Sequence, residues 1–97
     1  MVTSSHLDEL KGRLKIFHTF EDNHLQRLLE QSYEDVKNKC GVFEMTDNQG
    51  AELVYERTRY AYNDAIEYFD TNFESMIISF AFSNLRSDED VQTETHS

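Results

Sequence analysis

The 97-residue sequence lacks proline and tryptophan and contains one cysteine, three glycines and nine lysine and arginine residues. The single cysteine, Cys40, cannot form a disulfide within the chain, so we expect synthesis in a reducing, intracellular compartment. The isolated glycines leave no glycine-rich loop that could cradle a phosphate, and no paired His or Cys motif indicates a zinc site. We therefore expect no enzyme activity, no cofactor and no bound metal ion.

Basic residues are scarce relative to acidic ones. The chain has 19 Asp and Glu against 9 Lys and Arg, which gives a formal net charge of −10. Because nucleic-acid-binding proteins neutralise phosphates with clustered Lys and Arg, and anionic membranes attract basic segments, we expect neither sequence-specific nucleic acid nor a membrane as a partner. The longest apolar run, residues 76–82, is far shorter than the roughly 20 residues of a spanning helix. The first residues also show no signal-peptide pattern.

A chain of 97 residues has room for one core, and its apolar residues repeat with helical periods. The first predicted helix begins after Ser4 or Ser5, and Phe17 extends its apolar face. The second spans residues 22–40, and Gly41, which directly follows it, is typical of a helix end. Its predicted apolar face consists of Leu25, Leu28, Leu29, Tyr33, Val36 and Cys40. Polar residues 44–50 form a loop, and a third helix is predicted over residues 51–69.

The segment of residues 73–83 has two interpretations. Large apolar residues alternate with smaller or polar ones between Met76 and Phe82, which is typical of a β-strand, and we favour this interpretation. The alternative is a fourth amphipathic helix over residues 72–85. Residues 86–97 are polar and acidic, and we expect them to form a disordered tail. The predicted fold is therefore a small all-α bundle of three or four helices in residues 1–85, with a C-terminal extended segment.

Three further groups of residues are each open to two interpretations. The tyrosines of the third helix region either pack in the core or contribute contact area to a subunit interface. Arg57 and Arg59 pair either with acids of their own helix or with a neighbouring subunit. The acidic surface is either a solvated face or the lining of a channel that repels nucleic acid. The tyrosines concerned are Tyr55, Tyr60, Tyr62 and Tyr68.

The third helix region also carries a recognisable run. Residues 59–69 read Arg-Tyr-Ala-Tyr-Asn-Asp-Ala-Ile-Glu-Tyr-Phe, and Asp-Thr-Asn-Phe follows. Together with the short basic helix around residues 10–14 and the helix that ends in Cys40 and Gly41, this run resembles the head–tail connector (adaptor) family of tailed phages with Gram-positive hosts. The resemblance covers about residues 5–83. One departure is the absence of a proline ahead of the third helix.

This resemblance implies a structural virion protein, made in the host cytoplasm and located at the head–tail interface. Such proteins form a ring of about twelve subunits beneath the portal protein, extend the DNA channel and dock a tail-completion (stopper) protein. The family's C-terminal segment engages the portal, which assigns that role here to Phe73, Met76, Ile78, Phe80 and Phe82. The second and third helices would build the ring interface, with candidate residues Tyr55, Arg57, Arg59, Tyr62, Ile66 and Phe69.

Two other functions compete with the connector. A small acidic regulator, either antitoxin-like or a DNA mimic, would suit the net charge of −10. However, Lys and Arg residues interrupt the acids of the second helix, whereas a DNA mimic presents a continuous acidic face. A carboxylate site at Glu30, Glu34 and Asp35 lacks the histidine that normally accompanies it, so a solvated helix face explains these residues better.

Overall fold

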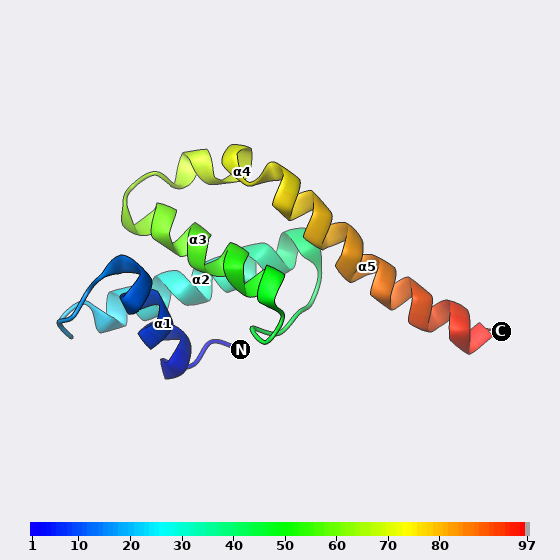
Figure 1. Ribbon diagram of the computed structural model, residues 1–97, viewed down its shortest axis with the longest axis horizontal. Helices are drawn as coiled ribbons and strands as arrows, with labels where there is room; N and C mark the ends of the chain where they lie inside the picture. The colour runs from blue at the N-terminus through cyan, green and yellow to red at the C-terminus, as the bar shows by residue number, and fades with distance from the viewer. Residues whose placement is uncertain (97) are drawn as a thin grey trace.

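The computed structural model describes the backbone of residues 1–96 and the side chains of residues 1–85. Over this range the fold is all-α, as predicted, with α-helices and one short 3₁₀ turn and without a strand (Figure 1). The elements in chain order are α1 (Ser4–Leu14), α2 (Asp22–Cys40), α3 (Asn48–Tyr62), the 3₁₀ turn η1 (Ile66–Tyr68), α4 (Phe69–Asn72) and α5 (Glu74–His96).

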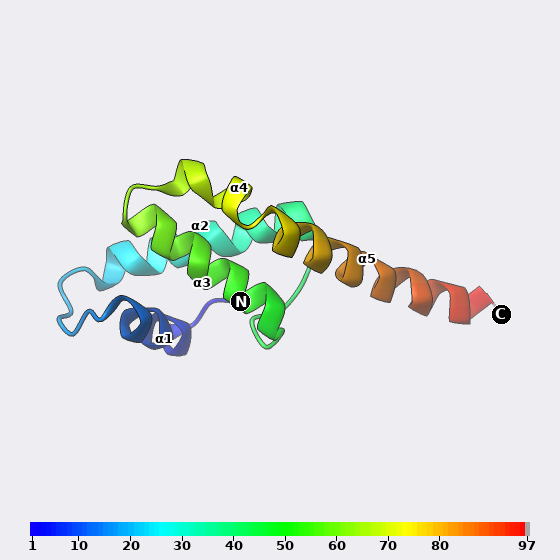
Figure 2. The same ribbon diagram turned by 45° about the horizontal axis from the view of Figure 1, so that its top comes forward.

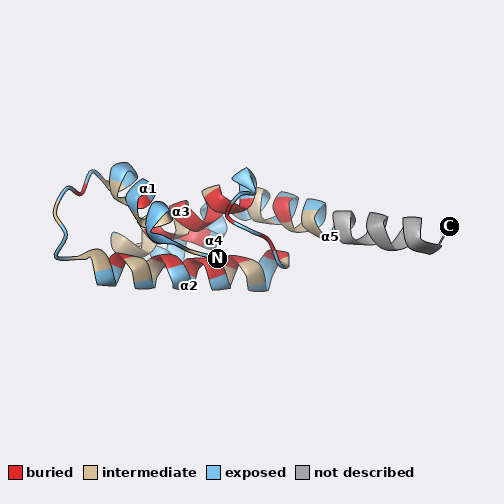
Figure 3. Ribbon diagram, turned by 90° about the horizontal axis from the view of Figure 1, so that it is seen from below, coloured by how far each residue is buried: buried red, intermediate tan, exposed pale blue. Residues whose placement is uncertain are grey.

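Helices α2 and α3 lie side by side at the centre of the bundle (Figures 1 and 2). Helix α1 packs on α2, and the first half of α5 packs on the other end of α2, near Cys40. Figure 3 shows buried residues recurring turn by turn along α2, with exposed residues between them on the rest of the helix. The buried residues of α2 are Leu25, Leu29, Ser32, Tyr33, Val36 and Cys40. The predicted span of α2 and its apolar face are confirmed, except that Leu28 is only partly buried.

The start of α3 is set by an N-terminal cap. The carboxylate of Asp47 accepts hydrogen bonds from the backbone N–H groups of Gln49 (3.0 Å) and Gly50 (3.2 Å), which would otherwise lack partners. The helix therefore starts earlier than predicted. It also ends earlier, at Tyr62 instead of residue 69, because Asp64 adopts a left-handed backbone conformation with φ 56°. The chain then continues through η1 and α4 before α5 begins.

The connection between α1 and α2 differs from the prediction in one respect. Helix α1 ends at Leu14, and Lys15 turns into the left-handed region with φ 58°. This turn places Ile16 in the core and leaves Phe17 exposed, so Phe17 does not extend the apolar face of the first helix. Arg13, one residue before the end of α1, ties that helix to α3 through its ion pair with Glu52 (3.1 Å).

The preferred prediction of a strand at residues 73–83 is wrong, and the alternative prediction of a fourth helix is correct for this segment. Met76, Ile77 and Phe80, together with Phe73 directly before the helix, recur at helical spacing and all pack toward the core, so the inward face of α5 follows a period of 3.6 rather than 2. A helix also satisfies its own backbone groups, whereas a strand needs a neighbour. Residues 86–96, which the sequence predicts to belong to a disordered acidic tail, have a helical backbone that continues α5, and residue 97 lies outside the described residues.

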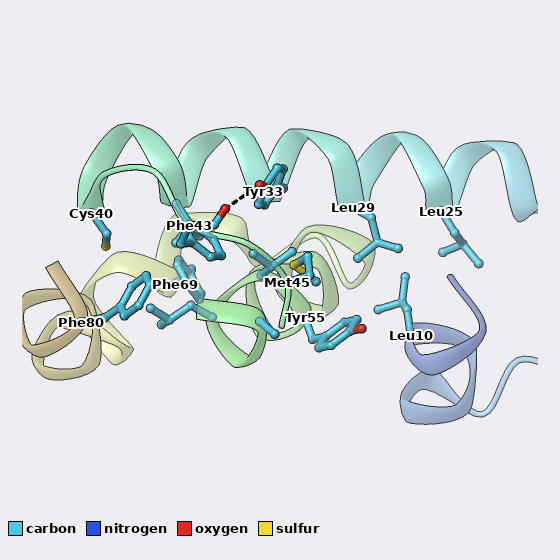
Figure 4. Packing of buried hydrophobic residues seen from close by; sticks show 14 of the residues in the cluster. Leu10, Leu25, Leu29, Tyr33, Cys40, Phe43, Met45, Tyr55, Phe69 and Phe80 are labelled. Carbon is cyan, nitrogen blue, oxygen red and sulfur yellow. Dashed lines mark hydrogen bonds between the residues drawn. The ribbon is translucent and has the colours of Figure 1, made fainter. Parts of the chain in front are cut away.

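Close aromatic packing joins α5 to the rest of the bundle (Figure 4). The rings of Phe43 and Phe80 meet edge to face with centroids 5.2 Å apart, and Tyr33 packs edge-on against Phe43 at the same separation. The Tyr33 hydroxyl donates a hydrogen bond of 2.6 Å to the Phe43 carbonyl, which fixes the α2–α3 loop. Gly50 lies against both phenylalanine rings, and a side chain there would meet them directly. The helices approach this closely because position 50 has no side chain.

Candidate functional site

Helix α5 presents an apolar surface to solvent. Ile78 is 59% exposed, Phe82 is 62% exposed and Leu85 is also exposed. These three residues are separated by four and three positions, so they lie along one side of the helix. We call this surface, Ile78, Phe82 and Leu85, the outer face of α5. No charged residue occurs between positions 75 and 85, although charged residues make up 29% of the chain.

The predicted portal-binding residues divide between the two sides of α5. Ile78 and Phe82 belong to the outer face. Phe80 is buried against Phe43, and Phe73 and Met76 pack against the core, so these three residues have structural positions within the bundle. The segment for which the sequence predicts portal binding is therefore a helix instead of a strand. Of the residues predicted for that contact, Ile78 and Phe82 are the exposed ones.

The end of α2 holds α5 in place through polar contacts. The side-chain amide of Asn84 donates hydrogen bonds to the carbonyls of Cys40 (2.9 Å) and Val42 (3.0 Å). The Cys40 carbonyl belongs to the last turn of α2, where backbone acceptors lack helical partners, and Val42 lies two residues beyond it. The buried Cys40 thiol lies 3.6 Å from the Ile77 carbonyl, and burial raises the pKa of this thiol above its ordinary value. The outer face is thus carried by a helix that is fixed at two points.

Two of the predicted subunit-interface residues lie in the core of the chain itself. Tyr55 is buried, with the Arg13 guanidinium 4.4 Å from its ring centroid. Phe69 is buried and stacks on Phe73 with centroids 5.0 Å apart. Their burial leaves no surface for a neighbouring subunit, so both residues are corrected to core positions.

Arg57, another predicted interface residue, forms its contacts within the chain. Its Nε atom lies 2.9 Å from an Asp35 carboxylate oxygen, and its guanidinium donates a hydrogen bond of 3.1 Å to the buried Ser32 hydroxyl. Lys39 pairs with the same Asp35 carboxylate at 2.7 Å and also with Asp70. Burial lowers the pKa of Lys39, but the bonds to the two carboxylates outweigh it, so the pKa is raised overall. This network joins α2 to α3 and α4.

The remaining predicted interface residues are partly accessible. Arg59 pairs with Glu56 one turn earlier on α3, and Tyr62 donates a hydrogen bond of 3.1 Å to Glu21. This hydrogen bond raises the pKa of the Tyr62 phenol, and burial adds to the effect. Ile66 is 38% exposed, and Tyr68 beside it is 59% exposed. Tyr68 is therefore one of the accessible tyrosines, a distinction that the sequence pattern alone did not make.

Sequence reasoning missed an exposed aromatic pair in the α1–α2 loop. Phe17 is 87% exposed and Phe20 is 83% exposed. The His18 ring stacks on Phe20 with centroids 3.7 Å apart, and His18 also lies 3.3 Å from the Glu21 carboxylate. Two exposed phenylalanines within four residues form a surface feature that a helical periodicity count assigns to the core.

Among residues 1–85, no three His, Cys, Asp or Glu side chains are placed to hold a metal ion together. In the same part of the chain, no helix is both long enough and apolar enough to cross a bilayer. Comparison of the chain with protein-family models, with curated proteins and with solved structures found no match.

Proposed function

We propose that this chain is a structural head–tail connector of a tailed phage. In this role it forms a ring of about twelve copies beneath the portal protein, extends the DNA channel and docks a tail-completion protein. It performs no chemistry. The portal contact is made by the outer face of α5, Ile78, Phe82 and Leu85, which docks as a helix in an apolar groove of the portal.

The observation that supports this proposal most directly is the uncharged, exposed outer face of α5. Large exposed apolar side chains on one helix side mark a surface for a protein partner. They occur in the segment for which the resemblance to connectors implies portal binding, residues 73–83. The chain has a net charge of −10. An uncharged part of its surface can therefore approach another protein with less electrostatic repulsion than the acidic parts.

The acidic surface supports the same proposal through its effect on DNA. A ring lined with carboxylates does not attract the phosphate backbone, so DNA would pass without being held. Six exposed acids lack a cationic partner within residues 1–85: Asp8, Glu30, Asp47, Asp64, Glu67 and Glu74. All but Asp47, which caps α3, are available for such a lining.

The test is an affinity purification from phage-infected or induced cells, with the tag on the N-terminus and the bound proteins identified by mass spectrometry. We expect a portal-sized ring protein and a second small tail-completion protein. The double variant Ile78→Ser/Phe82→Ser should lose the portal protein while keeping its urea midpoint, because both side chains are exposed. Val42→Ser, which removes an exposed apolar group from the α2–α3 loop, serves as the control and should retain the portal protein.

Retention of the portal protein by the double variant would refute the α5 contact. Recovery of one basic DNA-binding or toxin-like protein, with no virion protein, would refute the connector function and favour an acidic regulator.

A further inference from the structure

Most of the basic residues among residues 1–85 form ion pairs within the chain itself. Lys11 pairs with Asp22, Arg13 with Glu52, and the remaining cations of residues 1–85 are paired in the same way, with two exceptions. The exceptions are Lys15 and Arg27, both of which are exposed. Free cations are unexpected in a protein with more than twice as many acids as bases.

The two unpaired cations lie on either side of the exposed aromatic pair along the chain. Lys15 precedes Phe17 by two residues, and Arg27 lies on the exposed side of α2 within its first two turns, after Phe20. We call these four residues the aromatic patch. The stacking of His18 on Phe20 and the contact between His18 and Glu21 restrain this loop, so less conformational entropy is lost when the patch binds a partner.

A surface of the opposite character occurs around η1. Ile66 and Tyr68 are exposed there, and Asp64 and Glu67 are exposed acids without a cationic partner in the described part of the chain. We call these four residues the η1 patch. Each patch therefore combines two apolar side chains with two uncompensated charges, and the charges of the two patches have opposite signs.

We propose that the aromatic patch of one copy of this chain docks on the η1 patch of a second copy. Apolar contact between the phenylalanines and Ile66 or Tyr68 supplies the buried area, and the opposite charges set the orientation. The choice of a second copy as the occupant rests on the ring of the proposed function and on this complementarity. A contact between two unlike surfaces can be repeated from copy to copy around a closed ring.

Repulsion between copies makes the location of this contact specific. Two chains of net charge −10 repel each other over most of their surfaces, and the aromatic patch is where the described residues offer uncompensated positive charge. The contact does not involve the outer face of α5, to which the proposed function assigns portal binding.

The test uses the purified full chain without a portal, with the photoreactive amino acid p-benzoylphenylalanine in place of Phe20. Irradiation at millimolar protein concentration should crosslink two copies, and mass spectrometry should map the second site to residues 63–72. Crosslinks to the outer face of α5, or no crosslink between copies, would overturn the proposal. Because no portal is present, failure here leaves the portal contact intact, and loss of portal binding alone leaves this contact intact.

A charge exchange gives an independent measurement of the same contact by sedimentation. Lys15→Glu/Arg27→Glu should weaken self-association by about tenfold or more, and adding Asp64→Lys/Glu67→Lys to the same chain should restore it. Lysine is acceptable at position 64 because Lys15 adopts a similar left-handed φ in this protein. If the variant with all four substitutions did not regain self-association, the proposed contact between the aromatic patch and the η1 patch would be refuted.

Nucleic acid is the competing occupant of the aromatic patch, since exposed aromatic rings with cations also stack on single-stranded bases. Titration of the chain with a fluorescent single-stranded oligonucleotide separates the two possibilities. We expect no binding at physiological salt. Binding that is lost in Phe17→Ser/Phe20→Ser would overturn the self-contact in favour of a nucleic-acid surface.

Discussion

Replacement of glycine by alanine at positions 50 and 12 makes the same chemical change in two helices, with opposite expected effects on stability. Alanine is favoured over glycine in a helix by about 1 kcal/mol. At Gly12 the added Cβ meets nothing within 4 Å, so Gly12→Ala should stabilise the protein by up to that amount.

At Gly50 the added Cβ would lie 2.5 and 2.6 Å from carbons of the Phe43 ring and 2.8 Å from the Phe80 ring. Carbon atoms pack best at about 3.5–4.0 Å, and the two rings already support each other edge to face. Overpacking of a core costs about 1–3 kcal/mol, and contacts of 2.5–2.8 Å place position 50 in the upper part of this range, at about 2–3 kcal/mol. After the gain of about 1 kcal/mol in helix propensity is subtracted, Gly50→Ala should lower the free energy of unfolding by about 1–2 kcal/mol.

Urea unfolding followed by far-UV circular dichroism measures both variants against the unsubstituted chain. A domain of this size loses about 1 kcal/mol of stability per molar urea, so the midpoints of the two variants should differ by about 2 M. The slopes of the transitions should be unchanged. A Gly50→Ala midpoint equal to or above that of the unsubstituted chain would refute the close packing of α3 against Phe43 and Phe80.

Three further predictions concern α5 and its attachment. Phe80→Ala should lower the free energy of unfolding by about 3–5 kcal/mol, whereas Phe82→Ala on the outer face should change it by less than about 1 kcal/mol; equal losses in urea unfolding would contradict the assigned orientation of α5. Asn84→Ala removes two hydrogen bonds to carbonyls at the end of α2 and should cost about 1–2 kcal/mol, with faster amide hydrogen exchange in α5 than in α2; unchanged exchange would argue against this attachment. Burial raises the pKa of the Cys40 thiol above its ordinary value of about 9, so the folded chain keeps a proton that the unfolded chain releases. The free energy of unfolding should therefore be unaffected by this thiol below pH 9 and should fall by up to about 1.4 kcal/mol for each pH unit above it. Cys40→Ala should flatten this decline between pH 9 and pH 10, and an unchanged pH profile would contradict the burial of the thiol.

The sequence predicted α2 well because its signals agree with each other. Its apolar residues follow one helical face over about four turns, and Gly41 then takes a positive φ of 92° that favours glycine. The end of α3 was missed because Ile66 and Phe69 continue an apolar pattern beyond Tyr62. The break depends on Asp64 adopting a left-handed conformation, which no glycine or proline announces.

Residues 73–83 show how a short apolar run fits two periods. Met76, Ile78, Phe80 and Phe82 alternate, but Phe73, Met76, Ile77 and Phe80 also fit one helical face. The sequence could not decide between them, because the choice depends on the surface that receives Phe80, namely Phe43 and Gly50 on other elements. The exposed Phe17 and Phe20 were missed for a related reason, since periodicity counts apolar residues without showing which of them find a partner.

The two sides of α5 are subject to different constraints on sequence change. Phe43, Gly50 and Phe80 are in mutual contact, so a substitution at position 80 changes the space left for the side chains at positions 43 and 50. These three positions should therefore covary among related chains. Ile78, Phe82 and Leu85 touch the core little, so they should drift independently of that group and follow the surface of whichever protein they meet. A lineage could therefore acquire a new binding partner by changing a few outward-facing positions of one helix while its core remained the same.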